Sequence, residues 1–256
     1  MDRQTSTTGD PDTALRYSRH LVLPDFGAAG QERLGRSTAL LVGLGGLGSP
    51  AALYLAAAGV GRLLLNDFDR IDLSNLQRQV LYREADLGKS KTATAAAALA
   101  SLNPGCHLEI LEGRLDEAAL AAAVRRADVV LDGSDNFGTR FAVNAACVAA
   151  GRPLVSGAAI RYEGQLTVFD ARDPASPCYA CLYAEGDEEL ENCRQNGVLA
   201  PLTGVLGSLM AVEAVKLLAQ VGKPLMGRLL RYDALDGEMR YTPFKRDAAC
   251  PVCSRR

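Results

Sequence analysis

Short apolar runs alternate with alanine-rich or amphipathic segments along most of the chain. The apolar runs are nearly continuous, which predicts strands buried on both faces of a parallel sheet; they cover 38–43, 62–67, 107–113 and 128–136. The segments between them have helical length and composition, at about 49–58, 89–103, 116–127 and 141–151. This β-α alternation predicts an α/β fold, a doubly wound and mainly parallel sheet with helices on both faces.

Both ends of the chain depart from this alternation. Apolar positions at helical spacing predict a helix over 13–35, after a polar leader at 1–12 that we expect to be disordered. The last third contains further strands, a long helix and an antiparallel hairpin, at 153–160, 163–170, about 202–221 and 227–245. We therefore expect a single domain over 13–256.

Composition narrows the class of protein. The chain has 256 residues, of which 48% are hydrophobic and 23% charged, and a net charge of -2, so general nucleic-acid binding is not indicated. The leader has no apolar core and does not read as a secretory signal. The apolar run at 50–61 is too short to span a bilayer, so we expect a cytoplasmic protein.

A glycine loop follows the first predicted strand and opens a helix, which is the context of a Rossmann-like nucleotide site. Missing Cβ atoms let the backbone approach phosphate, and the helix N-terminus offers free N–H groups. An acidic residue after the second strand can accept a ribose hydroxyl. The candidates are Gly43, Gly45, Gly46 and Gly48 in the loop, and Asp67 or Asp69. This pattern alone does not separate NAD from ATP.

Charged and amide side chains after later strands favour ATP. Arg78 and Lys91 carry positive charge suited to phosphate oxygens, and Asp135 follows the fourth strand, where a carboxylate can hold Mg²⁺. Asn75 and Gln77 shortly precede Arg78, in a segment for which a dehydrogenase has no obvious use. Because ligands lie at the carboxyl ends of such strands, we expect these groups to converge.

Several motifs together resemble one family. In order they are RYSRHLVL, VGLGGLGSP, DFDRIDLSNLQRQ, GKSK, DGSDN, LVSGAAIRYEGQLTVF, CYAC, GVLAPLTGVLGS and CPVC. Their order is similar to that in the MoeB/ThiF/HesA family of ubiquitin-activating-enzyme-like adenylyltransferases, closest to its molybdopterin-synthase branch. The likeness runs from about Leu15 to Cys253.

The resemblance implies roles for individual residues. Gly46 would contact the nucleotide, Asp67 the ribose and Lys91 a phosphate. Asp135 and Asn136 would organise Mg²⁺ and ATP. The residues that would line the phosphates are Ser74, Asn75, Leu76, Gln77 and Arg78. Arg19 would reach into the site of a partner subunit, which implies a homodimer. All these residues are present in the matching motifs.

The resemblance also implies a reaction. The C-terminal glycine carboxylate of a small ubiquitin-fold sulfur carrier would attack the α-phosphate of ATP, giving an acyl adenylate and pyrophosphate. This step would prepare thiocarboxylate formation in molybdopterin, thiamine or related biosynthesis. The nucleophile is already ionised, so no side-chain base is required. Because the chain stops at Arg256, soon after the last cysteine, we expect the sulfur donor to be a separate protein, such as a cysteine desulfurase or sulfurtransferase.

Five of the seven cysteines suggest chemistry. Cys178, Cys181, Cys250 and Cys253 form two Cys-x-x-Cys pairs, which predicts a closed, structural four-sulfur zinc site. A redox pair is the weaker alternative, because two pairs coexist. Cys193 lies in a charged loop, where an exposed thiol can attack the acyl adenylate; an incidental cysteine is the competing interpretation.

Two other functions remain open from the sequence. The first is an NAD(P)-dependent oxidoreductase. This hypothesis accounts for the glycine loop and Asp67 but leaves Arg78, Lys91 and Asp135 without a role. A non-catalytic half of a heterodimeric activating enzyme is disfavoured, because such subunits lose phosphate-binding residues that this chain retains.

Overall fold

The computed structural model describes residues 11–183 and 196–254. Its centre is an eight-stranded sheet in the order β3-β2-β1-β4-β5-β6-β7-β8. The first five strands pair in parallel and the last three add antiparallel neighbours. The strands are β1 (Thr38–Val42), β2 (Arg62–Asn66), β3 (His107–Leu111), β4 (Val129–Asp132), β5 (Pro153–Ile160), β6 (Glu163–Asp170), β7 (Arg228–Asp233) and β8 (Glu238–Pro243). The predicted doubly wound, mainly parallel sheet is confirmed.

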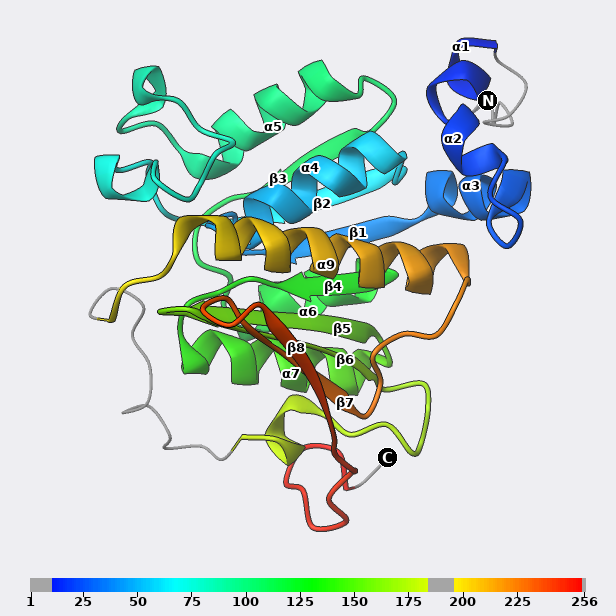
Figure 1. Ribbon diagram of the computed structural model, residues 1–256, viewed down its shortest axis with the longest axis vertical. Helices are drawn as coiled ribbons and strands as arrows, with labels where there is room; N and C mark the ends of the chain where they lie inside the picture. The colour runs from blue at the N-terminus through cyan, green and yellow to red at the C-terminus, as the bar shows by residue number, and fades with distance from the viewer. Residues whose placement is uncertain (1–10, 184–195, 255–256) are drawn as a thin grey trace.

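Helices cover both faces of the sheet (Figure 1). The longer ones are α3 (Gly27–Arg36), α4 (Gly48–Ala58), α5 (Lys91–Leu102), α6 (Glu117–Arg126), α7 (Phe137–Ala150) and α9 (Ala200–Ala219). In β1, Leu41 packs with α4, α5 and α9 on one face, while Leu40 packs with α6 and α7 on the other. Successive residues of a strand point to opposite faces, and both faces are covered by helices. The parallel strands are therefore nearly continuous apolar runs in the sequence.

The N-terminal helix predicted over 13–35 is wrong as a single element. The segment forms three helices, α1 (Pro11–Arg16), α2 (Ser18–Leu21) and α3. Pro24 lies in the break between α2 and α3, where its ring and missing N–H prevent a helix from continuing. The apolar spacing across the break follows contacts with the rest of the fold, since Tyr17 and Phe26 are both buried.

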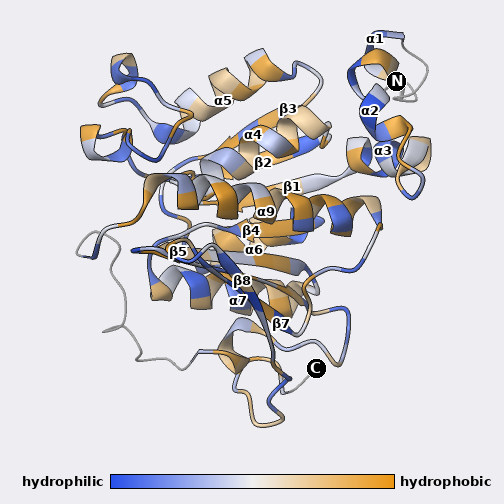
Figure 2. Cartoon of the chain, in the orientation of Figure 1, coloured by the Kyte–Doolittle hydropathy of each residue, from blue (hydrophilic) through white to orange (hydrophobic). Residues whose placement is uncertain are grey.

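The C-terminal hairpin extends the main sheet. Strand β7 pairs with β6 and β8 pairs with β7, and every residue of β8 is exposed. Figure 2 shows that β8 is mostly hydrophilic. Helix α9 is the one described helix that is long and apolar enough to cross a membrane, but over half of its most apolar stretch is buried inside the fold. It packs against α4 and β5, so it is a core helix.

Candidate active site

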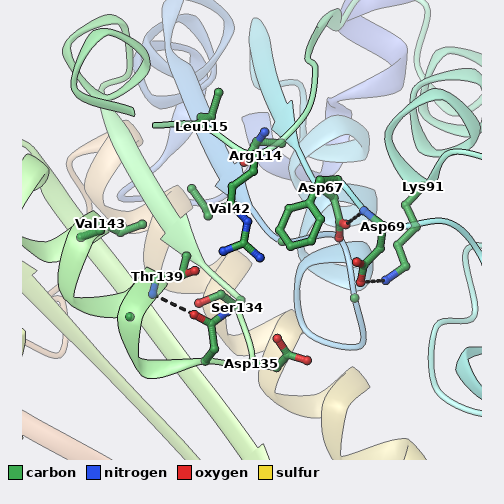
Figure 3. Close-up of a pocket in the computed structure, with 18 of the residues that line it drawn as sticks. Val42, Asp67, Asp69, Lys91, Arg114, Leu115, Ser134, Asp135, Thr139 and Val143 are labelled. Atoms are coloured by element: carbon green, nitrogen blue, oxygen red, sulfur yellow. Dashed lines mark hydrogen bonds and ion pairs between the residues drawn. The ribbon is translucent and has the colours of Figure 1, made fainter. Parts of the chain in front are cut away.

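A cavity of about 320 Å³ opens at the carboxyl ends of β1, β2 and β4 (Figure 3). Most of the residues predicted to bind the nucleotide line this cavity. They are Gly43, Gly45, Gly46, Asp67, Asp69, Arg78, Lys91, Asp135 and Asn136. These residues come from the three connections that follow β1, β2 and β4, which the sheet brings to one edge. The expected convergence is therefore observed.

The glycine loop is compact, and its glycines do different things. Gly43 has φ +86°, and a Cβ there would lie 3.1 Å from the backbone of Gly133. A Cβ on Gly48 would approach the Gly43 carbonyl oxygen to 1.9 Å, and Gly48 does not line the cavity. Gly48 is thus required for the loop to fold against the start of α4, while Gly45 and Gly46 face the ligand space.

Asp67 ties the glycine loop to the end of β2. Its Oδ2 accepts a hydrogen bond of 2.7 Å from the Leu44 N–H, and its Oδ1 accepts one of 2.8 Å from the Asp69 N–H. Burial raises the pKa of Asp67 above its ordinary value, partly offset by the nearby Lys91. The carboxylate keeps lone pairs free toward the cavity, as a ribose contact requires.

Lys91 stands at the start of α5 with its side chain only 5% exposed. Its ammonium lies 3.0 Å from Asp69 Oδ2, so the buried charge has a partner. Figure 3 shows this pair beside Asp67 at one side of the cavity. Of the two acids considered for the ribose, Asp69 is therefore engaged by Lys91, and Asp67 is the one that holds the loop.

The segment after β2 lines a second cavity of about 550 Å³. Ser74, Asn75 and Gln77 line only this neighbour, which shares Asp69 and Arg78 with the main cavity and is closed by Gly197 and Val198. The Arg78 guanidinium donates a 3.0 Å bond to the Ser74 carbonyl. Leu76 lines neither cavity and packs against the hydrophobic core.

Two carboxylates lie near the end of β4, the buried Asp132 within the strand and the exposed Asp135 in the loop that follows. Asp135 is exposed at the cavity, and Asn136 caps α7 by accepting a 2.9 Å bond from the Thr139 N–H. Asp132 is 1% exposed, and burial raises the pKa of its carboxyl. Arg140 donates to the Ser134 carbonyl at 2.9 Å and so fixes the loop that carries Asp135.

Two predicted residues lie elsewhere. Arg19 is exposed on α2, where it lines a separate shallow hollow with His20 and Tyr54, and it does not reach the cavity of its own chain. The His20 ring lies 2.9 Å from Gln31 Oε1 and faces Phe26. Cys193 lies outside the described residues.

Other cavity residues were missed by the motif analysis. Phe68, Gln79 and Arg114 line it, and so does an apolar group made of Val42, Leu115, Leu120, Ala142 and Val143. Phe68 and Gln79 adjoin the recognised Asp67 and Arg78, so their position beside a motif was the available signal. Arg114 follows β3 in a stretch without a motif, and only the fold brings it to the site.

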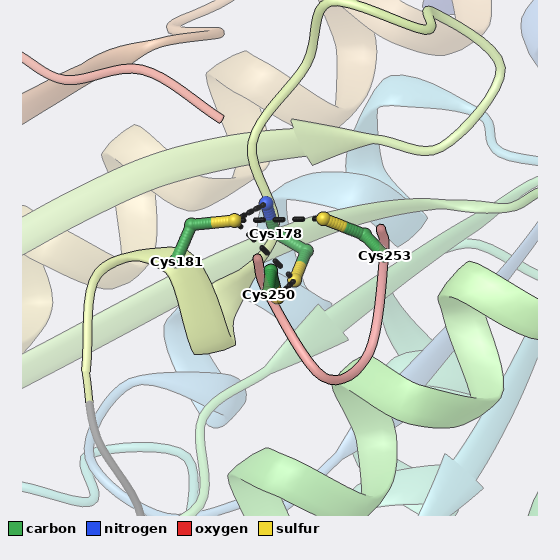
Figure 4. Close-up of side chains that lie close together, drawn as sticks. All are labelled: Cys178, Cys181, Cys250 and Cys253. Atoms are coloured by element: carbon green, nitrogen blue, oxygen red, sulfur yellow. Dashed lines mark hydrogen bonds between the residues drawn. The ribbon is translucent and has the colours of Figure 1, made fainter. Parts of the chain in front are cut away.

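Four cysteines form a cluster beside α7 (Figure 4). Their sulfur atoms all lie within 4.8 Å of one another, with separations of 3.6 Å for Cys178–Cys250 and 3.5 Å for Cys181–Cys253. Tetrahedral zinc with Zn–S bonds of about 2.3 Å requires sulfur separations of about 3.8 Å, so the cluster fits the metal. Asn144 of α7 donates to Cys178 Sγ at 3.7 Å.

The remaining described cysteines are structural. Cys106 and Cys147 are buried in the two hydrophobic clusters, away from the four-sulfur group.

Comparison with known proteins gives concordant matches. The ThiF family profile matches residues 17–252. Molybdopterin-synthase adenylyltransferase of Escherichia coli (strain K12) is 48% identical over 241 residues, 94% of this chain and 96% of that protein. Sulfur carrier protein ThiS adenylyltransferase of the same strain is 46% identical over 239 residues, 93% of this chain and 94% of that protein. The crystal structure of E. coli MccB with succinimide has a TM-score of 0.81 at 25% identity, covering 93% of this chain and 74% of that chain.

Proposed function

The chain belongs to the ThiF family, and from this premise we propose that it is an ATP-dependent adenylyltransferase. Its substrate is the C-terminal glycine carboxylate of a small ubiquitin-fold sulfur-carrier protein. The observation that carries the proposal is the convergence of the glycine loop, Asp67, Lys91, Arg78 and Asp135 on one cavity. The relatives named as adenylyltransferases for molybdopterin synthase and for ThiS, each matched over nearly their full length, support it.

The two adjoining cavities suggest how the substrates meet. ATP occupies the main cavity, with its ribose at Asp67 and its phosphates along Gly45, Gly46 and the start of α5. The carrier tail enters through the neighbouring cavity lined by Ser74, Asn75 and Gln77, which meets the first at Asp69 and Arg78. Arg78 therefore stands where the carboxylate and the α-phosphate come together.

The reaction is a displacement at the α-phosphorus. A carboxylate oxygen of the carrier forms the new P–O bond, the bond to the bridging oxygen breaks, and pyrophosphate leaves with that electron pair. Arg78 and Lys91 stabilise charge that builds on the phosphate oxygens in the transition state, which is the requirement for catalysis. Asp135 and Asn136 would hold Mg²⁺, which neutralises the triphosphate when bound.

Metal and partners complete the proposal. Cys178, Cys181, Cys250 and Cys253 hold a structural Zn²⁺ whose sulfur positions are already set. The protein acts in the cytoplasm as a homodimer, and Arg19 reaches the partner's site. A separate protein donates the sulfur, and Cys193 is a candidate for covalent transfer. Because relatives serving two different carriers match at 48% and 46% identity, the pathway stays undecided between molybdopterin, thiamine and related routes.

Isotope exchange between ATP and pyrophosphate tests the activity directly. We expect purified protein with Mg²⁺ and a glycine-terminated carrier to catalyse exchange, and to give no NAD(P)H absorbance change with candidate oxidoreductase substrates. Arg78→Ala and Asp135→Ala should each lower the exchange rate by about 10²-fold or more, because each removes a positioned charge. Unchanged far-ultraviolet circular dichroism would show that the variants fold. Wild-type exchange rates in both variants would refute the site.

A further inference from the structure

One cation of the main cavity has a contact unlike the others. The Arg114 guanidinium carbon lies 4.4 Å from the centre of the Phe68 ring. The Arg114 side chain makes no hydrogen bond or ion pair with any of the described residues. By contrast, Lys91 is paired with Asp69, and Arg78 donates to Ser74. Phe68 is 51% exposed and lines the same cavity, so its ring is accessible from the ligand side. This pair is therefore available to a ligand.

The backbone that carries Arg114 is held in place. Asn66, which is 6% exposed, donates from Nδ2 to the Leu111 carbonyl at 2.9 Å and to the Gly113 carbonyl at 3.0 Å. Gly113 directly precedes Arg114, and Leu111 lies three residues before it. The side chain thus starts from a fixed point at the end of β3 and extends into the cavity, as Figure 3 shows.

Polarity divides the cavity on either side of this side chain. In Figure 3, Val42, Leu115 and Val143 lie together on one side of Arg114, and Asp69 and Lys91 lie on the other. A nucleotide has the same division, with flat apolar base faces at one end and charged phosphates at the other. The match places the base against the apolar wall, with Arg114 along its open face.

We propose that Arg114 is a nucleobase clamp, which determines purine affinity by stacking its guanidinium on the base while Phe68 supports the guanidinium from behind. This inference rests on the proposed use of ATP and adds a specificity residue to it. A planar guanidinium suits this role, because it stacks on aromatic faces in a way that an ammonium does not. In this arrangement Arg114 contacts the base, while Lys91, Arg78 and the glycine loop contact the phosphates.

The test uses a fluorescent base. The chain has no tryptophan, so the emission of 2-aminopurine riboside triphosphate can be read without interference and is quenched when the base stacks. We expect Arg114→Leu to weaken binding by about 5- to 30-fold, the worth of one desolvated cation–π contact, and to abolish the quenching at saturation. Arg114→Lys should restore little quenching, and Phe68→Leu should give a smaller loss than Arg114→Leu.

Titrations with AMP, ADP and ATP separate a base contact from a phosphate contact. A base clamp predicts that Arg114→Leu weakens all three by the same factor, while Arg125→Leu, an exposed arginine on α6 away from the cavity, changes none of them. A loss that grows from AMP to ATP, or unchanged affinity and quenching, would overturn the clamp. Wild-type protein that binds 2-aminopurine nucleotide yet catalyses no exchange would instead overturn the proposed activity and leave the clamp standing.

Discussion

Asp67 anchors the glycine loop and lines the main cavity from a partly buried position. Burial raises the pKa of its carboxyl above 3.8, so the folded protein holds this proton more tightly than the unfolded chain. The stability contributed by this group is therefore complete below pH 3.8 and is lost as the pH rises through the raised pKa.

Asp67→Asn removes this titration. We expect the free energy of unfolding of the wild type, minus that of the variant, to decrease between pH 4 and 7, by about 1.4 kcal/mol for each unit of pKa displacement. Urea unfolding at several pH values measures it. Asp72→Asn is the control with opposite sign, because hydrogen bonds from the Ser74 hydroxyl and backbone N–H lower the pKa of Asp72. Its contribution is lost as the pH falls below about 4, so the urea series extends to that range. A pH-independent difference for Asp67→Asn would contradict the burial argument.

Single side chains were predictable where chemistry and spacing coincide. The sequence could place Gly43, Gly45, Gly46, Asp67, Arg78, Lys91 and Asp135 at one cavity, because a nucleotide site puts such groups after successive strands. Leu76 shared a motif with cavity residues, but an apolar side chain in that segment packs inward. Arg114 could not be named, because its place depends on how the loop after β3 folds over the sheet edge.

At the level of elements, α9 is the structural support for the glycine loop. Gly207 lets α9 approach the end of that loop so closely that an added Cβ would lie 2.4 Å from the Leu47 carbonyl oxygen and 2.5 Å from Pro50. One turn earlier, Gly204 has no atom within 4 Å of an added Cβ. The two positions form a matched pair on one helix.

Alanine at these two positions should have opposite effects. Gly204→Ala should raise the free energy of unfolding by about 0.5–1 kcal/mol, because it removes backbone freedom from the unfolded chain. Gly207→Ala should lower it by about 1–3 kcal/mol, the usual cost of overpacking, and should weaken ATP binding by shifting the loop. Thermal unfolding and titration with ATP measure both. Equal stability of the two variants would contradict this packing.

Secondary-structure elements were predicted best where the periodic pattern of apolar residues lies within the element itself. The strands and helices of the β-α alternation begin and end within a few residues of their predicted limits, since each element buries its own faces. The interruption at Pro24 was overlooked because Tyr17 and Phe26, on either side of the break, are buried by contacts distant in sequence. Pairing of β7 with β6 is likewise a long-range choice that the hairpin pattern leaves open.

Across the whole molecule, the four-cysteine cluster joins segments far apart in sequence, since Cys178 and Cys250 are separated by 72 positions. Zinc would fix the C-terminal segment to the middle of α7 through Asn144. We expect Cys250→Ser to lose the metal and several kcal/mol of stability, because metal affinity contributes directly to folding. Elemental analysis and thermal unfolding measure this. Cys106→Ala should retain one zinc per chain, and a zinc-free wild type would refute the site.

The position of Arg19 makes a prediction about two chains. Arg19 lies on α2, outside the cavity of its own chain, so any contact with ATP has to come from a second copy. Arg19→Ala and Asp135→Ala chains, each inactive alone, should then complement each other. In a mixed symmetric dimer one site receives both defects and the other receives none, so random mixing should restore about a quarter of wild-type exchange. A control mixture of two Asp135→Ala preparations should stay inactive. If the mixed chains are also inactive although mass spectrometry detects the heterodimer, Arg19 does not act across subunits.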